Sequence, residues 1–309
     1  MALDGAAYAQ QPLELTIEPD LLRALPAGNS LFSMLETVPP EVIADRFTAG
    51  GLNAATPPRF GALLNSWNQT QYRIGDVAVT DPLAGGRPLV VPDLALWPRM
   101  TIATGAMRID DNASALSVAI DPQRPTKTWV RTIDGAFSAA PLVSGVAGAI
   151  PAVDRVDGWQ EGHAAISGPL TDRLGLAAGA SWLGLSHVAA PNAGATSDRV
   201  ASAFAHLAFA SGPDEIRALG LVQRVSTAAT TDTAVHAQAT WERRVDAYGA
   251  WRAFAGYTER SRTAPLPSTA IVDSVDGNLP SDLFDAGDSS ARRWVVGART
   301  SPSATTGLP

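Results

Sequence analysis

The sequence predicts a mainly β protein, in which a small α+β domain is followed by long antiparallel strands. Residues 13–122 mix one amphipathic helix with short strands, whereas residues 123–309 consist of repeated alternating segments without a convincing helical period. Several of these later segments reach 10 residues or more, which is longer than the five or six usual in globular sheets. Residues typical of turns separate the segments, as expected between strands.

Composition excludes several classes of function. The 309 residues suffice for one large or two ordinary domains. The 23 basic and 30 acidic residues give a formal net charge of −7 without a basic cluster, which argues against a nucleic-acid partner. The absence of cysteine excludes disulfides, thiolate catalysis and Cys-ligated zinc. The sequence contains no apolar run long enough for a membrane helix, but membrane-crossing strands leave no such run.

The first residues are similar to the end of a secretory signal peptide. Ala7-Tyr8-Ala9 before Gln10 has the form of a cleavage site, although no charged start or apolar core precedes it. We therefore expect residues 1–12 to be a signal-peptide remnant or a linker. The alternative is that small residues at this spacing arise by chance in an Ala-rich chain.

One helix is predicted near the start of the chain. Asn29 or Ser30 can cap it, and Pro39-Pro40 ends it. Its apolar residues recur at i, i+3, i+4 and i+7, which is the spacing of one helix face. These residues are Leu31, Met34, Leu35 and Val38.

The stretch YRIGDVAVTDP, from Tyr72 to Pro82, predicts a tight hairpin. Gly75-Asp76 lies between two short alternating runs, and glycine at the first central position suits a type II′ two-residue turn. Pro82 then ends the second strand, because proline cannot donate to a strand ladder. Two other short strands are expected over residues 99–104 and 116–120.

The second part of the chain predicts long hairpins. Many of its apolar and polar residues alternate, so that each strand has one apolar face. Strands of this length suit a tilted crossing of a bilayer, and aromatic residues near their ends suit the girdles at the membrane interfaces. A soluble β-rich binding or adhesion protein, with these faces forming a sandwich core, is the alternative. The segments are residues 163–170, 174–188, 200–210, 216–225 and 235–243, and the aromatic residues are Trp182, Trp241, Trp251, Tyr257 and Trp294.

Several phrases resemble the plug domain and first barrel strands of TonB-dependent outer-membrane receptors, in the branch with carboxypeptidase-regulatory-like N-terminal regions. The phrases are, in chain order, Ser33–Pro39, Arg59-Phe60-Gly61, Tyr72–Pro82, Thr101–Ala106 and Ile166–Leu174. One departure is that Gly75-Asp76 stands where the family usually has Asp-Gly or Asn-Gly. The plug motif that the resemblance implies consists of Arg59, Phe60, Tyr72, Arg73, Gly75, Asp76, Thr80, Asp81, Pro82, Thr104 and Gly105.

The resemblance implies an architecture that this length of chain does not complete. It places a plug domain over residues 13–122 and transmembrane β-barrel strands over residues 123–300. The Ser, Thr, Pro and Gly composition of residues 301–309 predicts a disordered tail. A plugged barrel of about 22 strands needs roughly 220 residues in its strands alone. Residues 123–309 number only 187 and contain about eight predicted strands. We therefore expect an incomplete barrel and a fragment of a receptor.

The resemblance also implies a function in the Gram-negative outer membrane. A receptor of this kind takes up a small ligand, which the sequence does not resolve between siderophore, cobalamin, saccharide and peptide. Its implied partners are a TonB-type periplasmic energy transducer and the outer-membrane lipid. Residues 13–17 are the one extended candidate for the segment that TonB binds.

No enzyme, cofactor or metal site is predicted. The sequence contains no phosphate-binding glycine loop, no HExxH motif and no nucleophile elbow. Lone histidines on the polar faces of strands are more often surface or lumen residues than ligands. They are His163, His187, His206 and His236.

Overall fold

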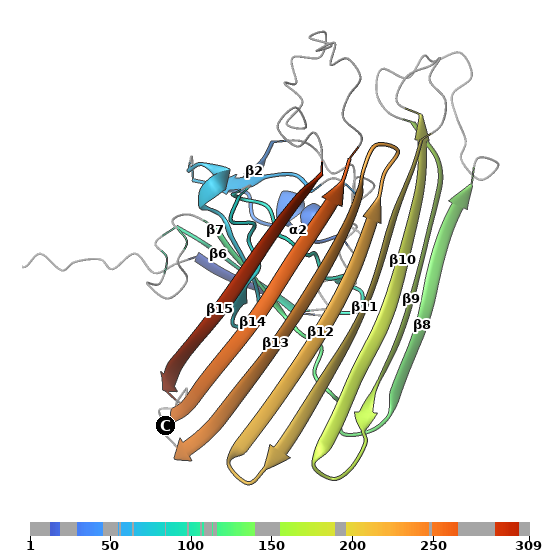
Figure 1. Ribbon diagram of the computed structural model, residues 1–309. Coiled ribbons are helices and arrows are strands. Elements are labelled where there is room, and N and C mark those ends of the chain that lie inside the picture. The colour runs from blue at the N-terminus through green and yellow to red at the C-terminus, as the bar shows by residue number, and fades with distance from the viewer. Residues whose placement is uncertain are drawn as a thin grey trace, which may run out of the picture.

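The structure is a computed structural model with two main parts (Figure 1). A five-stranded sheet, a helix and a two-stranded sheet form the plug, residues 13–121. An eight-stranded sheet, residues 130–302, forms what we refer to as the wall. The structure describes residues 13–18, 30–45, 55, 57–63, 65–83, 85–97, 99–105, 107, 113, 116–139, 155–188, 196–246, 249–264 and 288–302. Residues 1–12, the expected signal-peptide remnant, lie outside them.

The plug sheet is mixed and has the strand order β1-β6-β7-β4-β5. Strands β4 and β7 are parallel, and the other neighbours are antiparallel. The strands predicted over residues 99–104 and 116–120 are thereby confirmed. The plug elements are β1 (Leu13–Ile17), α2 (Leu31–Thr37), β2 (Val42–Ala44), β3 (Phe60–Ala62), the short 3-10 helix η2 (Trp67–Gln69), β4 (Gln71–Ile74), β5 (Val77–Ala78), β6 (Arg99–Thr104) and β7 (Leu116–Asp121).

Helix α2 begins and ends as predicted. Of the two candidate caps, Ser30 is the one used, and its hydroxyl accepts a hydrogen bond from the backbone N–H of Ser33 at 3.5 Å. The predicted apolar face is buried, apart from Val38, which is half-buried at the end of the helix. This face packs into the plug core.

The predicted hairpin is formed by β4 and β5, which are joined by Gly75 and Asp76. Gly75 has φ +56°, and among the described residues Leu63 is the only non-glycine residue with positive φ. A positive followed by a negative φ is the signature of the type II′ turn, so this prediction is confirmed. Strand β5 ends at Ala78, before the predicted stop at Pro82, because the chain then pairs with residues 87–89.

Every neighbouring pair of strands in the wall is antiparallel, in the order β15-β14-β13-β12-β11-β10-β9-β8. The predicted hairpins are confirmed. The strand predicted over residues 174–188 has these bounds, and the other four strands are longer than predicted. Their bounds are β8 (Val130–Ala139), β9 (Arg155–Pro169), β10 (Leu174–Val188), β11 (Thr196–Ser211), β12 (Asp214–Ser226), β13 (Thr231–Asp246), β14 (Gly249–Thr263) and β15 (Ser289–Pro302).

The last strand corrects the predicted disordered tail of residues 301–309. Ser301 and Pro302 belong to β15, where they are paired with Ala250 and Gly249. The Ser-Pro composition suggested a tail, but an end strand tolerates proline because its N–H need not join the ladder. Residues 303–309 lie outside the described part.

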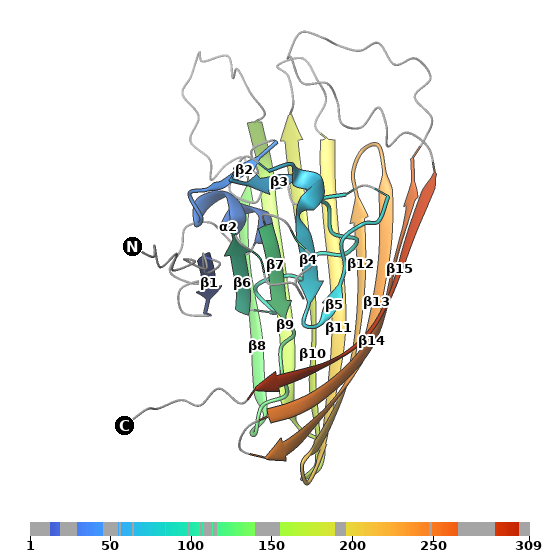
Figure 2. The same cartoon turned by 90° about the vertical axis from the view of Figure 1, so that its left-hand side faces the viewer.

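The wall is an open, curved sheet, and the plug lies on its concave face (Figure 2). Within the described residues, the end strands β8 and β15 do not pair with each other. The predicted combination of a plug with an incomplete antiparallel barrel is confirmed at the level of the fold. No helix in the described part of the chain is long and apolar enough to cross a membrane.

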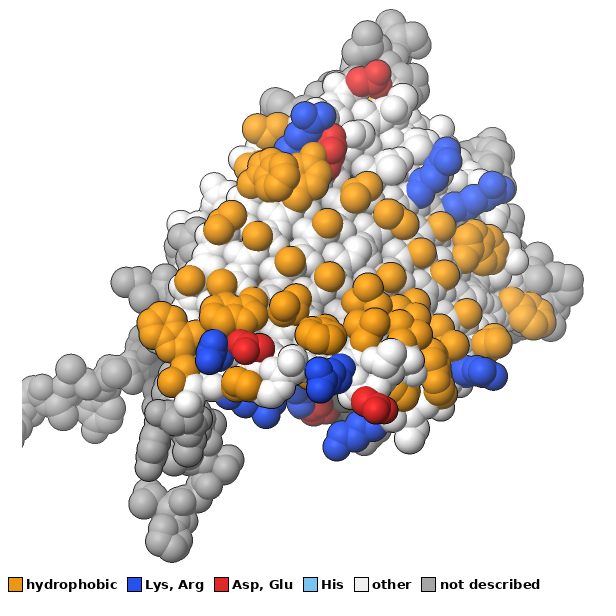
Figure 3. Space-filling model, turned by 60° about the horizontal axis from the view of Figure 1, so that its bottom comes forward, with side chains coloured by type: hydrophobic (Ala, Val, Ile, Leu, Met, Phe, Trp, Pro, Cys, Tyr) orange, Lys and Arg blue, Asp and Glu red, His pale blue; other side chains and the backbone are white. Residues whose placement is uncertain are grey.

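The two faces of the wall differ in chemistry. In β13 the polar residues His236 and Thr240 are buried on the inner face, while Val235 and Trp241 are exposed on the outer face. Figure 3 shows apolar side chains spread over the outer face, with charged side chains near its margins. The large exposed apolar residues of strands β10 to β15 are Trp182, Leu207, Phe209, Ile216, Val222, Val235, Trp241, Val245, Trp251, Trp294 and Val296.

One hydrophobic core joins the plug to the inner face of the wall. The plug segment around Leu94 and Trp97 packs against the wall, and the Trp97 ring meets the ring of Phe204 edge-on at 5.3 Å between centroids. Both residues are buried, with 1% of Trp97 and 6% of Phe204 exposed. This apolar contact anchors the plug.

A glycine allows close approach where the hairpin meets the wall. A Cβ built on Gly256 of β14 would lie 2.5 Å from a methyl carbon of Val77 in β5. That spacing is too short for any side chain. By contrast, a Cβ on Gly220 of β12 would meet nothing within 4 Å.

We expect Gly256→Ala to destabilise the seating of the plug, whereas Gly220→Ala leaves it unchanged. The added methyl group must push Val77 away, at a cost of about 1–3 kcal/mol. Urea unfolding of the chain in detergent micelles, followed by tryptophan fluorescence, measures both variants. Equal stability of the two variants would contradict the close packing of β5 on β14.

Candidate functional site

The candidate site is the polar seam between the plug and the inner face of the wall. The β4–β5 hairpin directs its turn toward β14 and β15, near the end of the wall where the connections between strands are short. Turn residue Asp76 has only 5% of its side chain exposed. Burying an ionised carboxylate to this extent costs several kcal/mol unless a cationic partner or hydrogen-bond donors compensate the charge.

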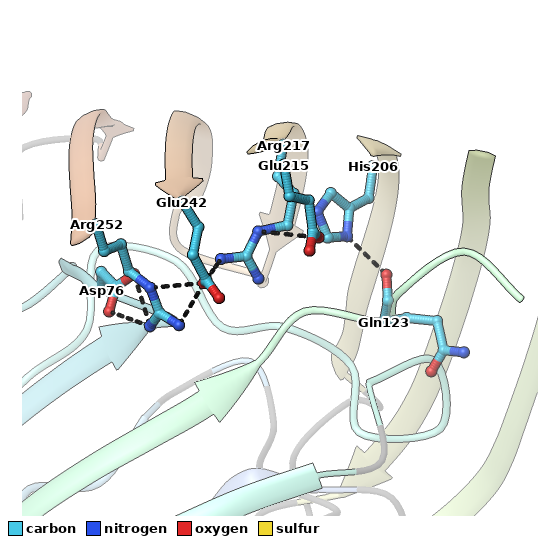
Figure 4. A network of polar contacts seen from close by, with 7 residues as sticks. All are labelled: Asp76, Gln123, His206, Glu215, Arg217, Glu242 and Arg252. Atoms are coloured by element: carbon cyan, nitrogen blue, oxygen red, sulfur yellow. Dashed lines mark hydrogen bonds and ion pairs between the residues drawn. The ribbon is translucent and has the colours of Figure 1, made fainter. Parts of the chain in front are cut away.

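Two arginines of the wall supply that partner. Arg252 of β14 points Nη1 at both carboxylate oxygens of Asp76, at 3.4 Å, and Arg299 of β15 forms a second ion pair with the same carboxylate. Arg252 also donates from Nη2 to Glu242 of β13 at 2.6 Å and from Nε at 3.0 Å. Its guanidinium thus links a carboxylate of the plug to one of the wall (Figure 4).

The network continues across the inner face of the wall. Arg217 of β12 lies 3.3 Å from Glu242 and 3.6 Å from Glu215. On β11, Nδ1 of His206 lies 2.7 Å from the backbone carbonyl of Gln123, in the segment that follows β7. These side chains lie in one row along β11 to β14 (Figure 4).

A second ionic contact holds the far end of the hairpin. Asp81 is almost fully buried, and Arg260 of β14 donates to its carboxylate at 2.6 Å. Arg293 of β15 donates to the carbonyl of Thr80 at 2.9 Å. The hairpin is therefore held to β14 and β15 at both of its ends.

The plug segment before β6 makes two further polar contacts with the wall. The Gln223 amide donates to the carbonyl of Val91 at 2.6 Å and accepts from its N–H at 3.1 Å. On β9, Nδ1 of His163 lies 3.1 Å from a carboxylate oxygen of Asp93. His163 and His206 are buried on the inner face, as is His236, which bonds Thr258. The side chain of His187 lies outside the described part.

The structure divides the predicted motif residues into two groups. One group faces the wall or lines the space beside it: Arg73, Gly75, Asp76, Thr80 and Asp81. The others organise the plug itself or lie on its surface. Of these, Phe60 stacks on Phe32, Arg59 lies over the Trp67 ring, Thr104 donates to Glu41, Tyr72 is buried, Gly105 has positive φ and Pro82 is exposed.

The residues of the wall that contact the hairpin were not predicted from the sequence. A signal for them exists, because Arg252 and Arg260 alternate with the aromatic residues Trp251 and Tyr257 of the same strand. A charge on the face opposite an aromatic belt points into the barrel. Their plug partners cannot be read from that pattern.

A cavity of about 740 Å³ lies beside the seam, between the plug sheet and the wall. Arg217 is the fourth residue of β12 and Arg252 is the fourth residue of β14. Each of these strands follows a connection of only two residues, so the cavity lies near the short-turn end of the wall. In barrels of the outer membrane this end faces the periplasm.

The candidate TonB-binding segment is a strand of the plug. All five residues of β1 are paired with β6 at the edge of the sheet. Directly after it, Glu18 accepts a hydrogen bond from Nε of Arg99 at 3.2 Å, and this bond raises the pKa of Arg99. Among the described residues, no group of His, Asp and Glu is suited to hold a metal ion.

No protein-family model and no curated protein matches the sequence. Solved structures nevertheless share its fold. A mutant of the ferric enterobactin receptor PfeA from Pseudomonas aeruginosa superposes with a TM-score of 0.65 at 11% identity, over 94% of this chain and 46% of that chain. The fold is that of a TonB-dependent outer-membrane receptor.

Two other solved structures agree. The siderophore receptor PirA from Acinetobacter baumannii gives a TM-score of 0.63 at 13% identity, over 91% of this chain and 44% of that chain. The outer-membrane transporter YddB from Escherichia coli gives 0.58 at 13% identity, over 93% of this chain and 43% of that chain. This chain therefore spans less than half the length of these receptors.

We expect Asp76→Asn to loosen the plug in this receptor fold. The substitution leaves Arg252 and Arg299 facing a neutral group, and loss of one partner of a buried ion pair costs about 3 kcal/mol. Hydrogen exchange of the β4–β5 amides measures the opening. Asp232→Asn is the control, because Asp232 pairs with Arg262 inside the wall.

A double-mutant cycle with Arg299→Gln tests whether the loss belongs to the ion pair. If it does, the second substitution costs less in the Asp76→Asn background than in the native chain, with a coupling of about 0.5–3 kcal/mol. Additive effects would contradict the pairing of Asp76 with Arg299.

A substitution of Tyr72 is expected to stabilise the protein, in contrast to the substitution of Asp76. Its hydroxyl is fully buried and has no hydrogen-bond partner within the described structure, and burial, with a smaller contribution from Asp45, raises its pKa. We expect Tyr72→Phe to raise the free energy of unfolding by about 1 kcal/mol, because an unpaired buried hydroxyl is removed. Tyr257→Phe is the control, since the Tyr257 hydroxyl donates to Glu259.

The same variant changes the alkaline limit of stability. Because the pKa of Tyr72 is higher in the folded than in the unfolded state, its titration leaves the free energy of unfolding unchanged below about pH 10 and lowers it as the pH rises further, where only the unfolded state ionises. Unfolding at pH 9 and pH 11 measures this loss. An equal loss in Tyr72→Phe would show that Tyr72 is not its source.

Proposed function

We propose that the chain is part of a TonB-dependent outer-membrane receptor for the energised uptake of a small ligand. The observation that supports this most is a plug held by a row of ion pairs on the inner face of an open curved sheet, whose outer face is apolar. The proposed domain boundaries are those of the sequence: a plug over residues 13–122 and barrel strands over residues 123–300.

The outer face supports placement in the Gram-negative outer membrane. Strands β9 to β15 have 13 to 16 residues, more than the nine to eleven needed to cross a bilayer at a tilt. Their outward apolar residues would contact lipid, and the tryptophans would sit at the interfaces. In the soluble alternative a further layer must cover this face, because exposed apolar surface of that extent is rare on soluble monomers.

The construction of the seam supports uptake by displacement of the plug. Ion pairs and hydrogen bonds at the hairpin can exchange for water, which a wholly apolar interface cannot do. Strand β1 lies at the edge of the plug sheet, where a TonB-type periplasmic protein could pull on the chain. In this proposal the chain makes and breaks no bond of its ligand.

The ligand stays open between a siderophore, cobalamin, a saccharide and a peptide. PfeA is a receptor for ferric enterobactin and PirA one for siderophores, which favours the first class. The long loops that would meet a ligand from outside lie outside the described residues, so no ligand-binding residue is proposed there.

Cell fractionation tests the proposed location. Expressed in a Gram-negative cell behind a secretory signal peptide, the chain should be found in the outer-membrane fraction and stay there after a high-salt wash. Salt removes proteins held by charge but not those held by apolar burial. Recovery in the soluble periplasm or in the medium would instead support the soluble binding protein.

The substitution Val296→Arg distinguishes an outer-membrane protein from a soluble binding protein. Val296 of β15 is 81% exposed on the outer face. On a lipid-facing strand an arginine costs about 2–4 kcal/mol near the midplane, whereas at a solvated surface position it changes stability by about 0.5 kcal/mol or less. Unchanged stability and fractionation of the variant would contradict contact with lipid.

A further inference from the structure

The cavity beside the seam has an uneven distribution of charge. Its lining contains six arginines and four acidic residues. Most of the arginines lie toward the wall, and the acidic residues other than Asp76 lie toward the edge of the plug sheet. The two groups adjoin where Asp121 of β7 and Arg73 of β4 share one face of neighbouring strands. One end is formed by β4, the segment after β7 and the wall, and the other by β1, β6 and the end of β7. The uncharged lining residues of the cavity include Gln123, Gln238 and Thr240, and Leu219 is a large apolar side chain among them.

The end next to the wall is basic. Arginines reach the cavity there from both the plug and the wall, and Asp76 is the one acidic residue among the lining residues of that end. Glu215 and Glu242 contact Arg217 but do not line the cavity, so they lower the positive charge without removing it. The five arginines are Arg73, Arg124, Arg217, Arg252 and Arg299.

The end at the edge of the plug sheet is acidic. Glu14 of β1 and Glu18, directly after this strand, are exposed and line the cavity. Asp121 of β7 lies opposite Arg99 in the register of the sheet, and Arg99 is already bonded to Glu18. Three carboxylates therefore share a single arginine at this end.

We propose that this cavity binds a small zwitterion, with a carboxylate or phosphate at one end and an ammonium group at the other. A polyanion would be attracted by the arginines but repelled by Glu14, Glu18 and Asp121. A polycation would be attracted by these three carboxylates but repelled by the arginines. Only a ligand with separated charges of both signs is complementary to both ends. The volume lies within the range usual for small-molecule sites. The site does not depend on the uptake proposed above.

The test uses triglycine as the probe, together with its N-acetyl and C-terminal amide forms, which each lack one charge. Isothermal titration calorimetry measures binding to the whole chain in detergent micelles. We expect triglycine to bind at least about tenfold more tightly than either blocked form, because each blocked form leaves one end of the cavity unmatched.

Two variants test which end of the cavity binds the carboxylate of the probe and which end binds its ammonium group. Arg124→Gln should weaken triglycine and its N-acetyl form by about two- to fivefold, as expected for exposed charges, and leave the amide form unchanged. Glu14→Gln should weaken triglycine and the amide form by the same factor and leave the N-acetyl form unchanged. Lys127→Gln is the control, because Lys127 is exposed and does not line the cavity.

Three results would overturn the proposal. The first is the absence of triglycine binding at millimolar concentration. The second is equal affinity for the three peptides, which would show that binding does not depend on the charges at the two ends of the cavity. The third is tighter binding of inorganic pyrophosphate than of triglycine, which would mean that the arginines alone decide the ligand. A failure of membrane placement would leave each of these results unaffected.

Discussion

The contact on which the arrangement of the two parts depends is the carboxylate of Asp76 between Arg252 and Arg299. Burying one of these charges without the other would cost several kcal/mol, so the plug is held where the partners meet. The contact also fixes which strands the hairpin faces, since the two arginines come from neighbouring strands of the wall. The cavity and the second ion pair, at Asp81, follow from that placement.

The order of two turn residues makes this contact possible. A type II′ turn requires positive φ at its first central position, which Gly75 supplies, and leaves the second position open to a side chain. With Asp-Gly, the order usual in the family that the sequence resembles, the carboxylate would stand at the first position instead. In the sequence the exchange is a departure from the family that the chain resembles. In the structure it places a charge against the wall.

Local features of the fold could be predicted, because each depends on neighbours in the sequence. The Ser30 cap, the turn at Gly75 and the alternating faces of β13 follow from capping, turn chemistry and the two-residue period of strands. The site could not be predicted in this way. Asp76 and Arg252 are 176 residues apart, and their meeting depends on the register of every strand between β8 and β14. The early end of β5 had a similar cause, since residues 87–89 compete for its edge.

The interface between the plug and the wall is apolar at Trp97 and ionic at Asp76. This difference decides which end separates at the lower cost in free energy. At Trp97 and Phe204, separation would expose buried apolar surface at about 25 cal/mol per Å². At Asp76, separation of the plug from the wall would replace ion pairs beside a cavity by hydrated charges. The hydration of these charges offsets the loss of the ion pairs, because the free energy that their desolvation cost is regained. In the uptake proposed above, a pull on the plug would therefore open the charged end first, while the apolar anchor would keep the plug on the wall. Displacement about an anchor needs less free energy than expulsion of the whole plug, because most of the buried apolar area never leaves its contacts.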